Sequence, residues 1–163
     1  MGDLEIRPPR PEEFEAVGAL TVAAYDADGL LSDNVGYETE LRDVARRAEH
    51  AELLVAVLGG AVVGTVAVVR PGTSYAEISR EGELEFRMLA VDPSARGRGV
   101  GAALTQAVLS RARTLGLRRV VLSSLERMHA AHRLYERLDF RRLPARDWQP
   151  FPDITLIAYE RDL

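Results

Sequence analysis

The hydrophobic positions of the chain follow two different periods, which together predict alternating helices and strands. Apolar residues recur with the spacing of an amphipathic helix over Phe14–Tyr25, Tyr37–Ala48, Val100–Leu115 and Ala131–Leu138. Segments of strand length that contain branched, aromatic or other apolar residues predict strands at 4–7, 84–91, 119–123, 140–143 and 154–159. With a valine-rich hairpin before the loop at 71–82, the predicted order is β-α-α-β-β-β-α-β-α-β-β. This order is typical of a single α/β or α+β domain, residues 1–163, with a mixed sheet.

The segment from Leu53 to Val69 carries no charge and allows two interpretations. Its length reaches the lower limit for a membrane helix, and Gly60 and Gly64 have the G-x-x-x-G spacing of packed membrane helices. The alternative is a β-hairpin, because two valine-rich runs meet at Gly59-Gly60, a dipeptide suited to a tight turn. We favour the hairpin, since a mean hydropathy of −0.10 and the amphipathic helices elsewhere indicate a soluble protein.

The composition excludes several kinds of chemistry. All 21 basic residues are arginines, and the sequence contains neither lysine nor cysteine. A lysine Schiff base, a thiol nucleophile, a disulfide and a thiolate metal site are therefore excluded. The net charge of −4 gives no electrostatic reason to expect nucleic acid as a partner. The first ten residues include acids and lack the apolar core of a secretory signal, so a cytoplasmic location is expected.

The most informative segment joins the predicted strand at 84–91 to the predicted helix at 100–115. It reads Val91-Asp92-Pro93-Ser94-Ala95-Arg96-Gly97-Arg98-Gly99-Val100-Gly101-Ala102. Glycines let bare backbone N–H groups approach a ligand, and the unpaired amides of a helix N-terminus favour an anion such as pyrophosphate. Arg96 and Arg98 would add positive charge. The alternative without a ligand is a flexible turn with two solvated arginines.

A dinucleotide-binding fingerprint is a competing interpretation of the same turn. Gly97, Gly99 and Ala102 satisfy G-x-G-x-x-A, and Glu126 follows at about the distance expected of a ribose-binding acid. In Rossmann-type folds, however, the glycines follow the strand almost at once, whereas here a proline-containing loop intervenes. Flanking arginines also suit a ligand richer in phosphate than NAD.

Three stretches together resemble the GNAT superfamily of acyl-CoA-dependent N-acyltransferases. Arg96, Gly99 and Gly101 match its Arg/Gln-x-x-Gly-x-Gly/Ala pyrophosphate loop. Residues 89–93 resemble the family's L-x-V-x-P strand end, and residues 131–140 resemble its A-x-x-L-Y-E-x-x-G-F segment. The resemblance implies a mixed, mostly antiparallel sheet of about seven strands flanked by four helices. It also implies acetyl-CoA as co-substrate.

Two residues depart from the family's pattern. Asp139 replaces the usual glycine before Phe140, which costs stability if the backbone there is left-handed. Met128 occupies a position where many members carry an asparagine that helps to hold the pantetheine arm. The first departure concerns a helix end, and the second puts one cofactor contact in doubt.

The resemblance assigns roles to individual residues. Tyr135 matches the tyrosine that protonates the departing thiolate, a role suited to a phenol of pKa about 10 facing a thiol of about 8.5. It also lies on the apolar stripe of its helix, so a core position is the alternative. Glu85 is the candidate general base, acting through water, although it and nearby Glu83 could be plain solvated acids. The residues implied in cofactor binding are Leu89, Ala90, Val91, Arg96, Gly97, Arg98, Gly99, Val100, Gly101 and Ala102.

The implied reaction moves an acetyl group from acetyl-CoA to a primary amine of a small molecule, peptide or protein. In the family the acceptor is bound by the first two helices, their connector and the loop before the strand at 84–91. These segments contain the polar residues Tyr25, Asp26, Asp28, Asp33, Tyr37 and Tyr75, whose acids point to a cationic amine. The alternative is a non-catalytic acyl-CoA-binding sensor or interaction module. A homodimer fits the resemblance, and no nucleic-acid or membrane partner is expected.

Two histidines raise the question of a metal site. His129 and His132 share helical spacing with Glu126 and Glu136. Two histidines without an H-E-x-x-H arrangement are more typical of plain surface residues. We therefore expect no metal.

Overall fold

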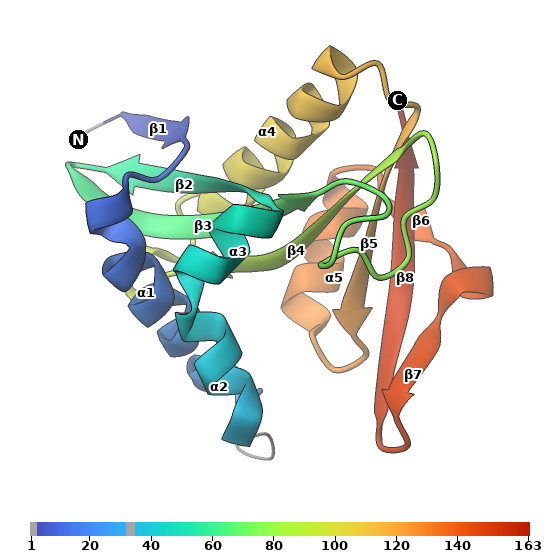
Figure 1. Cartoon of the computed structure of the whole chain (residues 1–163), viewed down its shortest axis with the longest axis horizontal. Coiled ribbons are helices and arrows are strands. Elements are labelled where there is room, and N and C mark those ends of the chain that lie inside the picture. Colours follow the sequence, from blue (N-terminus) through green and yellow to red (C-terminus); the bar gives the residue numbers. More distant parts are fainter. Residues whose placement is uncertain (1–2, 32–34) are drawn as a thin grey trace. The chain divides into compact units, whose positions relative to one another are not determined.

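The computed structural model describes residues 3–31 and 35–163 (Figure 1). The chain divides into two units, and strand β4 belongs to both. Unit 1 consists of Met1–Val68 and Met88–Ala107, and unit 2 of Val69–Arg87 and Val108–Leu163. β4 runs over Glu83–Val91, so it passes from unit 2 into unit 1 at Met88. The units are described in turn.

Unit 1 contains a three-stranded antiparallel arrangement followed by the second half of β4. β1 (Leu4–Arg7) pairs with β2 (Glu52–Leu58), and β2 pairs with β3 (Ala61–Val69). Gly59 and Gly60 form the turn between β2 and β3 with φ of 59° and 82°, a conformation that glycine adopts without strain. The predicted hairpin is confirmed, and a membrane span for this segment is wrong. Within the described residues, no helix is long and apolar enough to cross a membrane.

Helices precede this hairpin in unit 1. A short 3₁₀ turn, η1 (Pro11–Glu13), leads into α1 (Phe14–Ala27), and α1 packs against α2 (Val35–Arg42) and α3 (Val44–His50). The single helix predicted over Tyr37–Ala48 is wrong. Asp43 breaks it, and its side chain caps α3 by accepting a 3.2 Å hydrogen bond from the backbone N–H of Arg46.

Helix α4 follows the glycine-rich turn over Val100–Thr114 and begins in unit 1. A 3₁₀ turn, η2 (Pro93–Ala95), comes before it. Gly116, just past the end of α4, has φ of 72°, which confirms the predicted glycine cap.

Unit 2 is built on the first half of β4, β5 (Arg119–Leu125) and β8 (Ile154–Asp162). β4 and β5 are parallel, with Glu85 opposite Val121, whereas β5 and β8 are antiparallel. β6 (Arg141–Arg142) and β7 (Trp148–Phe151) also pair with β8. The remaining elements are α5 (His129–Arg137) and the 3₁₀ turn η3 (Pro144–Arg146).

The fold class is confirmed as mixed and mostly antiparallel, with two corrections. Within the described residues the structure has eight strands rather than about seven, and five α-helices rather than four. The extra strand is β7, and the extra helix comes from the break at Asp43.

Two residues other than glycine have left-handed backbone. Asp139 has φ of 66°, so the position where the family carries glycine is left-handed here as well. Met88 has φ of 55° and lies within β4, at the point where the strand passes from one unit to the other. No feature of the sequence signals the unusual backbone at Met88.

Candidate active site

Each unit holds one group of the predicted site residues. Unit 1 contains the residues implied in cofactor binding, from the end of β4 to the first turn of α4. Unit 2 contains Tyr135 and Glu85.

The turn between β4 and α4 is fixed by Asp92. The backbone N–H of Asp92 donates to the carbonyl of Val63 on β3 at 2.8 Å. Its carboxylate accepts bonds from the N–H and hydroxyl of Ser94, at 2.9 and 2.8 Å, which lower the pKa of Asp92. Asp92 thereby caps η2, and Ala95 is buried beneath the turn. The predicted anion-binding turn therefore starts from a fixed backbone.

The first turn of α4 leaves backbone amides without partners in the helix, as the N-terminus of any helix does. Gly97 and Gly99 have φ of 80° and 76°, which side-chain-bearing residues rarely adopt. The carbonyl of Gly99 accepts from the N–H of Ala103 at 3.0 Å, so the helical ladder begins there. The amides of the preceding residues have no acceptor within the helix. A Cβ built on Gly99 would meet no described atom within 4 Å, so a ligand can approach the backbone closely.

The two arginines of the turn have different surroundings. The guanidinium of Arg96 forms a two-pronged ion pair with Asp28, at 2.8 and 3.2 Å, and donates to the carbonyl of Ala24 at 3.3 Å. Arg96 thus ties the turn to the end of α1. Arg98 is exposed, and no described residue forms a hydrogen bond or ion pair with it. Arg98 is accordingly the better placed of the two to meet a phosphate.

Tyr135 lies inside unit 2. Its ring packs against Phe86, Phe140 and Tyr159, with ring centroids 5.8, 6.0 and 5.8 Å away. Burial raises the pKa of Tyr135 above its ordinary value, with a smaller contribution from Tyr159. The hydroxyl therefore stays protonated throughout the physiological range, as a proton donor must.

Glu85 is fully buried on β4, and its carboxylate accepts hydrogen bonds from backbone amides. The N–H groups of Glu77, Ile78 and Ser79 lie 3.0, 3.2 and 3.1 Å from Oε1. The interpretation of Glu85 as a plain solvated acid is wrong. Its role as general base stays a prediction.

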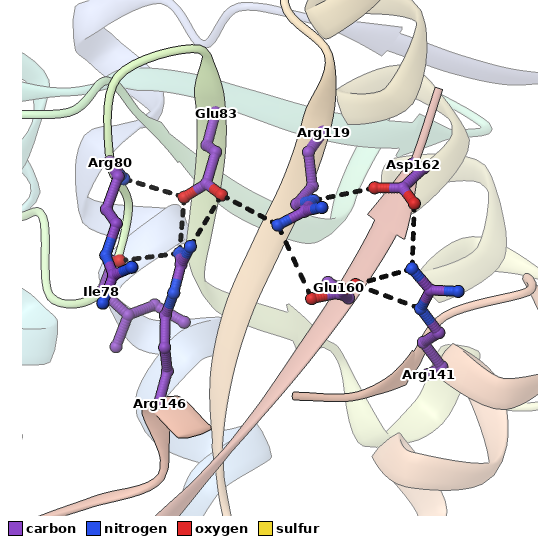
Figure 2. A network of polar contacts seen from close by, with 8 residues as sticks. All are labelled: Ile78, Arg80, Glu83, Arg119, Arg141, Arg146, Glu160 and Asp162. Atoms are coloured by element: carbon purple, nitrogen blue, oxygen red, sulfur yellow. Dashed lines mark hydrogen bonds and ion pairs between the residues drawn. The ribbon is translucent and has the colours of Figure 1, made fainter. Parts of the chain in front are cut away.

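Glu83 is also buried, although the sequence suggested a solvated acid. Its carboxylate binds Arg146 at 2.5 and 3.0 Å and Arg119 at 3.4 Å (Figure 2). The hydrogen bonds and charges of these partners outweigh burial, so the pKa of Glu83 is lowered. Nothing in the sequence connects Glu83 with Arg146, because the two are distant along the chain.

His132 is the other residue that sequence reasoning misplaced. It is buried rather than exposed, and its Nε2 lies 3.0 Å from the carbonyl of Leu125 and 3.1 Å from the Ser124 hydroxyl. Burial lowers the pKa of His132 below 6.5. Because the carbonyl can only accept, Nε2 is the donor, and His132 ties the start of α5 to the end of β5. Among the described residues, no group of three His, Asp or Glu side chains could hold a metal ion.

The residues expected to bind the acceptor fall into both units. In unit 1, Tyr25 and Tyr37 pack edge to face with centroids 5.8 Å apart, and Asp28 is engaged by Arg96. Asp33 lies outside the described residues. In unit 2, Tyr75 is buried, and the Arg87 guanidinium stacks over its ring at 5.8 Å.

Comparison with known proteins places these features in a family. The family model described as the acetyltransferase (GNAT) family matches residues 19–140. A GNAT-family acetyltransferase from Staphylococcus aureus has a similar fold, with a TM-score of 0.77 and 16% identity over 99% of both chains. At that identity the likeness shows the fold alone.

Two curated relatives match shorter stretches. N-acetylaspartate synthetase from Rattus norvegicus is 38% identical over 107 residues, which are 66% of this chain and 33% of that protein. Mycothiol acetyltransferase from Geodermatophilus obscurus is 48% identical over 58 residues, which are 36% of this chain and 19% of that protein. The aligned parts thus span about a third or less of these relatives.

Proposed function

Because the chain belongs to the GNAT acetyltransferase family, we propose that it transfers the acetyl group of acetyl-CoA to a primary amine. The observation that supports the proposal is the first turn of α4, where left-handed glycines and amides without helical partners follow β4 and would cradle a pyrophosphate. Both curated relatives carry names that state acetyl transfer or an acetylated product. A cytoplasmic location and a homodimer belong to the same proposal as expectations from the sequence.

The cofactor would be held mainly by backbone groups of unit 1. The amides of Val100, Gly101 and Ala102 would donate to the pyrophosphate, with Arg98 supplying positive charge. Gly97 and Gly99 give the turn before α4 its left-handed backbone, which residues with a side chain rarely adopt. Backbone groups of Leu89 and Val91 would bond the pantetheine arm and the thioester oxygen. Arg96 is assigned a supporting part, because its guanidinium is already bound to Asp28 and Ala24.

Acetyl-CoA supplies a thioester, and the reaction forms a nitrogen–carbon bond while the carbon–sulfur bond breaks. The amine must arrive uncharged and lose one proton, and the departing thiolate must gain one. Backbone donors of β4 would stabilise the negative charge that develops on the thioester oxygen. Tyr135 would donate its proton to the sulfur.

The relatives' names indicate small-molecule acceptors for those two proteins, which suggests a small amine for this one. The acids near the end of α1 would attract a cationic amine. Asp26 and Asp28 are both exposed, but Asp28 is already paired with Arg96, so Asp26 is the better candidate to attract the amine.

Release of free thiol from acetyl-CoA in the presence of a panel of amines tests the proposal. Thiol release with at least one amine supports an acetyltransferase. Tight binding of acetyl-CoA by calorimetry without turnover on any amine would favour the non-catalytic sensor. Absence of binding would contradict both.

A matched pair of glycine variants tests the cradle itself. Gly101→Val places a bulky side chain in the first turn of α4 and should abolish measurable acetyl-CoA binding. Gly36→Val is the control, because Gly36 holds the same second position in α2 and a Cβ there would meet no described atom within 4 Å. Equal affinity for acetyl-CoA in both variants would show that the pyrophosphate does not bind at this turn.

A further inference from the structure

The segment from Glu77 to Arg80 has no helix or strand, yet several side chains of β4 hold its backbone in place. Three consecutive amides, those of Glu77, Ile78 and Ser79, converge on Oε1 of Glu85 within 3.2 Å. The N–H of Glu77 is also 3.3 Å from Oε2. A fully buried carboxylate must be compensated by hydrogen bonds or opposite charge, and here the loop backbone provides the compensation.

From this geometry we infer that Glu85 is a positioning residue that anchors the loop before β4, rather than the acceptor of the amine's proton. Oε1 is occupied by three N–H donors, and a proton taken up by Oε2 would neutralise the carboxylate whose charge strengthens those three bonds. A proton on Oε1 would also place an O–H among groups that can only donate. The inference rests on the proposed function, because the loop carries Tyr75, one of the residues expected to meet the acceptor.

A second buried carboxylate on the same strand face holds the same segment. Glu83 accepts a 2.8 Å bond from the N–H of Arg80. Arg146 of η3 bridges Glu83 and the loop, because its Nη1 also donates to the carbonyl of Ile78 at 3.2 Å (Figure 2). Arg119 continues the network from Glu83 to Glu160 and Asp162 on β8, as Figure 2 shows.

The third anchor is Arg87, the next residue on this face. Glu83, Glu85 and Arg87 alternate along β4, and alternate residues of a strand point to the same side. Arg87 donates to the carbonyl of Tyr75 at 3.2 Å and pairs with Glu77 at 3.2 Å. The three side chains on one face of the first half of β4 thus all hold the loop, and Glu85 is the middle one.

Two variants of Glu85 separate anchoring from proton acceptance. Glu85→Gln keeps an oxygen that can accept the three N–H bonds but removes the charge, whereas Glu85→Ala removes the acceptor altogether. Hydrogen exchange of the amides of residues 77–79 should accelerate at least about tenfold in the alanine variant and less in the glutamine variant. Glu81→Gln is the control, because Glu81 is an exposed acid next to the same segment.

Kinetics supply the second measurement. An anchor predicts that Glu85→Ala raises the KM for the amine about tenfold or more while the dissociation constant of acetyl-CoA stays unchanged. Glu85→Gln should restore most of that loss and keep the wild-type pH–rate profile. A general base predicts the reverse, a fall of about 10²–10⁴-fold in the rate of Glu85→Gln with the three amides still protected.

Either of two results would overturn the inference: unchanged amide exchange in Glu85→Ala, or a flattened pH–rate profile in Glu85→Gln. The exchange measurement needs no turnover. It therefore tests whether Glu85 anchors the loop even if the wild-type protein acetylates none of the amines tested. Such a lack of activity would count only against the proposed function. If Glu85→Ala does not fold, the glutamine variant still gives both the exchange and the pH profile.

Discussion

Replacing Gly64 by alanine should disturb both the stability of unit 1 and the binding of acetyl-CoA. Gly64 lies on β3 beneath the start of α4. An added Cβ would be 2.7 Å from Cγ1 of Val100, 3.0 Å from Cδ1 of Leu104 and 3.3 Å from the carbonyl oxygen of Ala90. Comfortable contacts between carbon atoms are about 3.5–4.0 Å, so the first turn of α4 must move by roughly 0.8 Å or more. Leu104 can rotate away, but Val100 and the backbone of Ala90 cannot.

The size of the effect follows from overpacking. Inserting one methyl group into a packed interior costs about 1–3 kcal/mol. For a chain of this length that corresponds to a fall in Tm of roughly 2–12 °C. The amides of the first turn move together with Val100, and a misaligned bond to a charged phosphate costs about 1.5–3 kcal/mol. The affinity for acetyl-CoA should therefore fall about tenfold or more.

Urea unfolding and calorimetric titration with acetyl-CoA measure the two losses. Gly36→Ala is the control, because it adds the same methyl group to an exposed helical glycine with open space around it and should raise stability by about 0.5–1 kcal/mol. Adding Val100→Ala to Gly64→Ala removes the nearest clashing atom and should recover part of the affinity. Wild-type stability and affinity in Gly64→Ala would refute the reasoning.

Three further substitutions have defined outcomes. Tyr135→Phe should lower kcat about 10²–10⁴-fold with Tm nearly constant, and the deficit should shrink with donors whose thiols leave more readily; an equal loss across donors would make the hydroxyl structural. Because burial lowers the pKa of His132 below 6.5, the unfolded chain binds that proton more tightly, and the free energy of unfolding should fall as pH drops below 6.5. His132→Gln should weaken this pH dependence of the free energy of unfolding, measured by urea unfolding between pH 7.5 and 5. An unchanged dependence would mean that another group causes it. Asp139→Gly should raise stability by about 1 kcal/mol in the same assay, since φ is 66° there, and a loss would mean that the Asp side chain stabilises the turn.

The elements predicted correctly are those with strong local signals. The β2–β3 hairpin follows from two valine-rich runs and the Gly59-Gly60 turn, and α4 follows from its apolar stripe and from Gly116. The apolar spacing from Tyr37 to Ala48 continues through the break between α2 and α3, so the hydrophobic pattern predicts one helix there. Asp43 was the available signal, since aspartate is a preferred helix cap.

The sequence does not predict strand β7, for a different reason. Its sequence contains Pro150, and proline within a short run argues against a strand. The structure accommodates the proline because the ladder with β8 is irregular between Trp148 and Phe151. A sequence pattern cannot show where a ladder is irregular, so that the N–H donor that proline lacks is not needed.

The glycine-rich turn and Tyr135 could be proposed as site residues from the sequence because their motifs are contiguous. The environment of Glu85 could not, because it is created by amides of a loop whose own sequence carries no distinctive pattern. The same holds for Glu83, whose main partner, Arg146, lies far along the chain. Charged residues in a strand are usually solvated, so burial of both carboxylates is a property of the tertiary structure.

The raised pKa of Tyr135 bears on how it would act in the proposed reaction. Burial makes the phenol a weaker acid than an ordinary tyrosine, and each unit of pKa difference from the leaving thiol costs about 1.4 kcal/mol for complete proton transfer. Complete transfer to the sulfur is therefore uphill unless Tyr135 regains a proton. The attacking amine becomes acidic once its nitrogen is bonded to carbon, and it must lose a proton in any case. In the proposed reaction Tyr135 would pass its proton to the sulfur and would be reprotonated by the proton that the amine releases. This route balances the reaction without a carboxylate base, which agrees with the anchoring role inferred for Glu85.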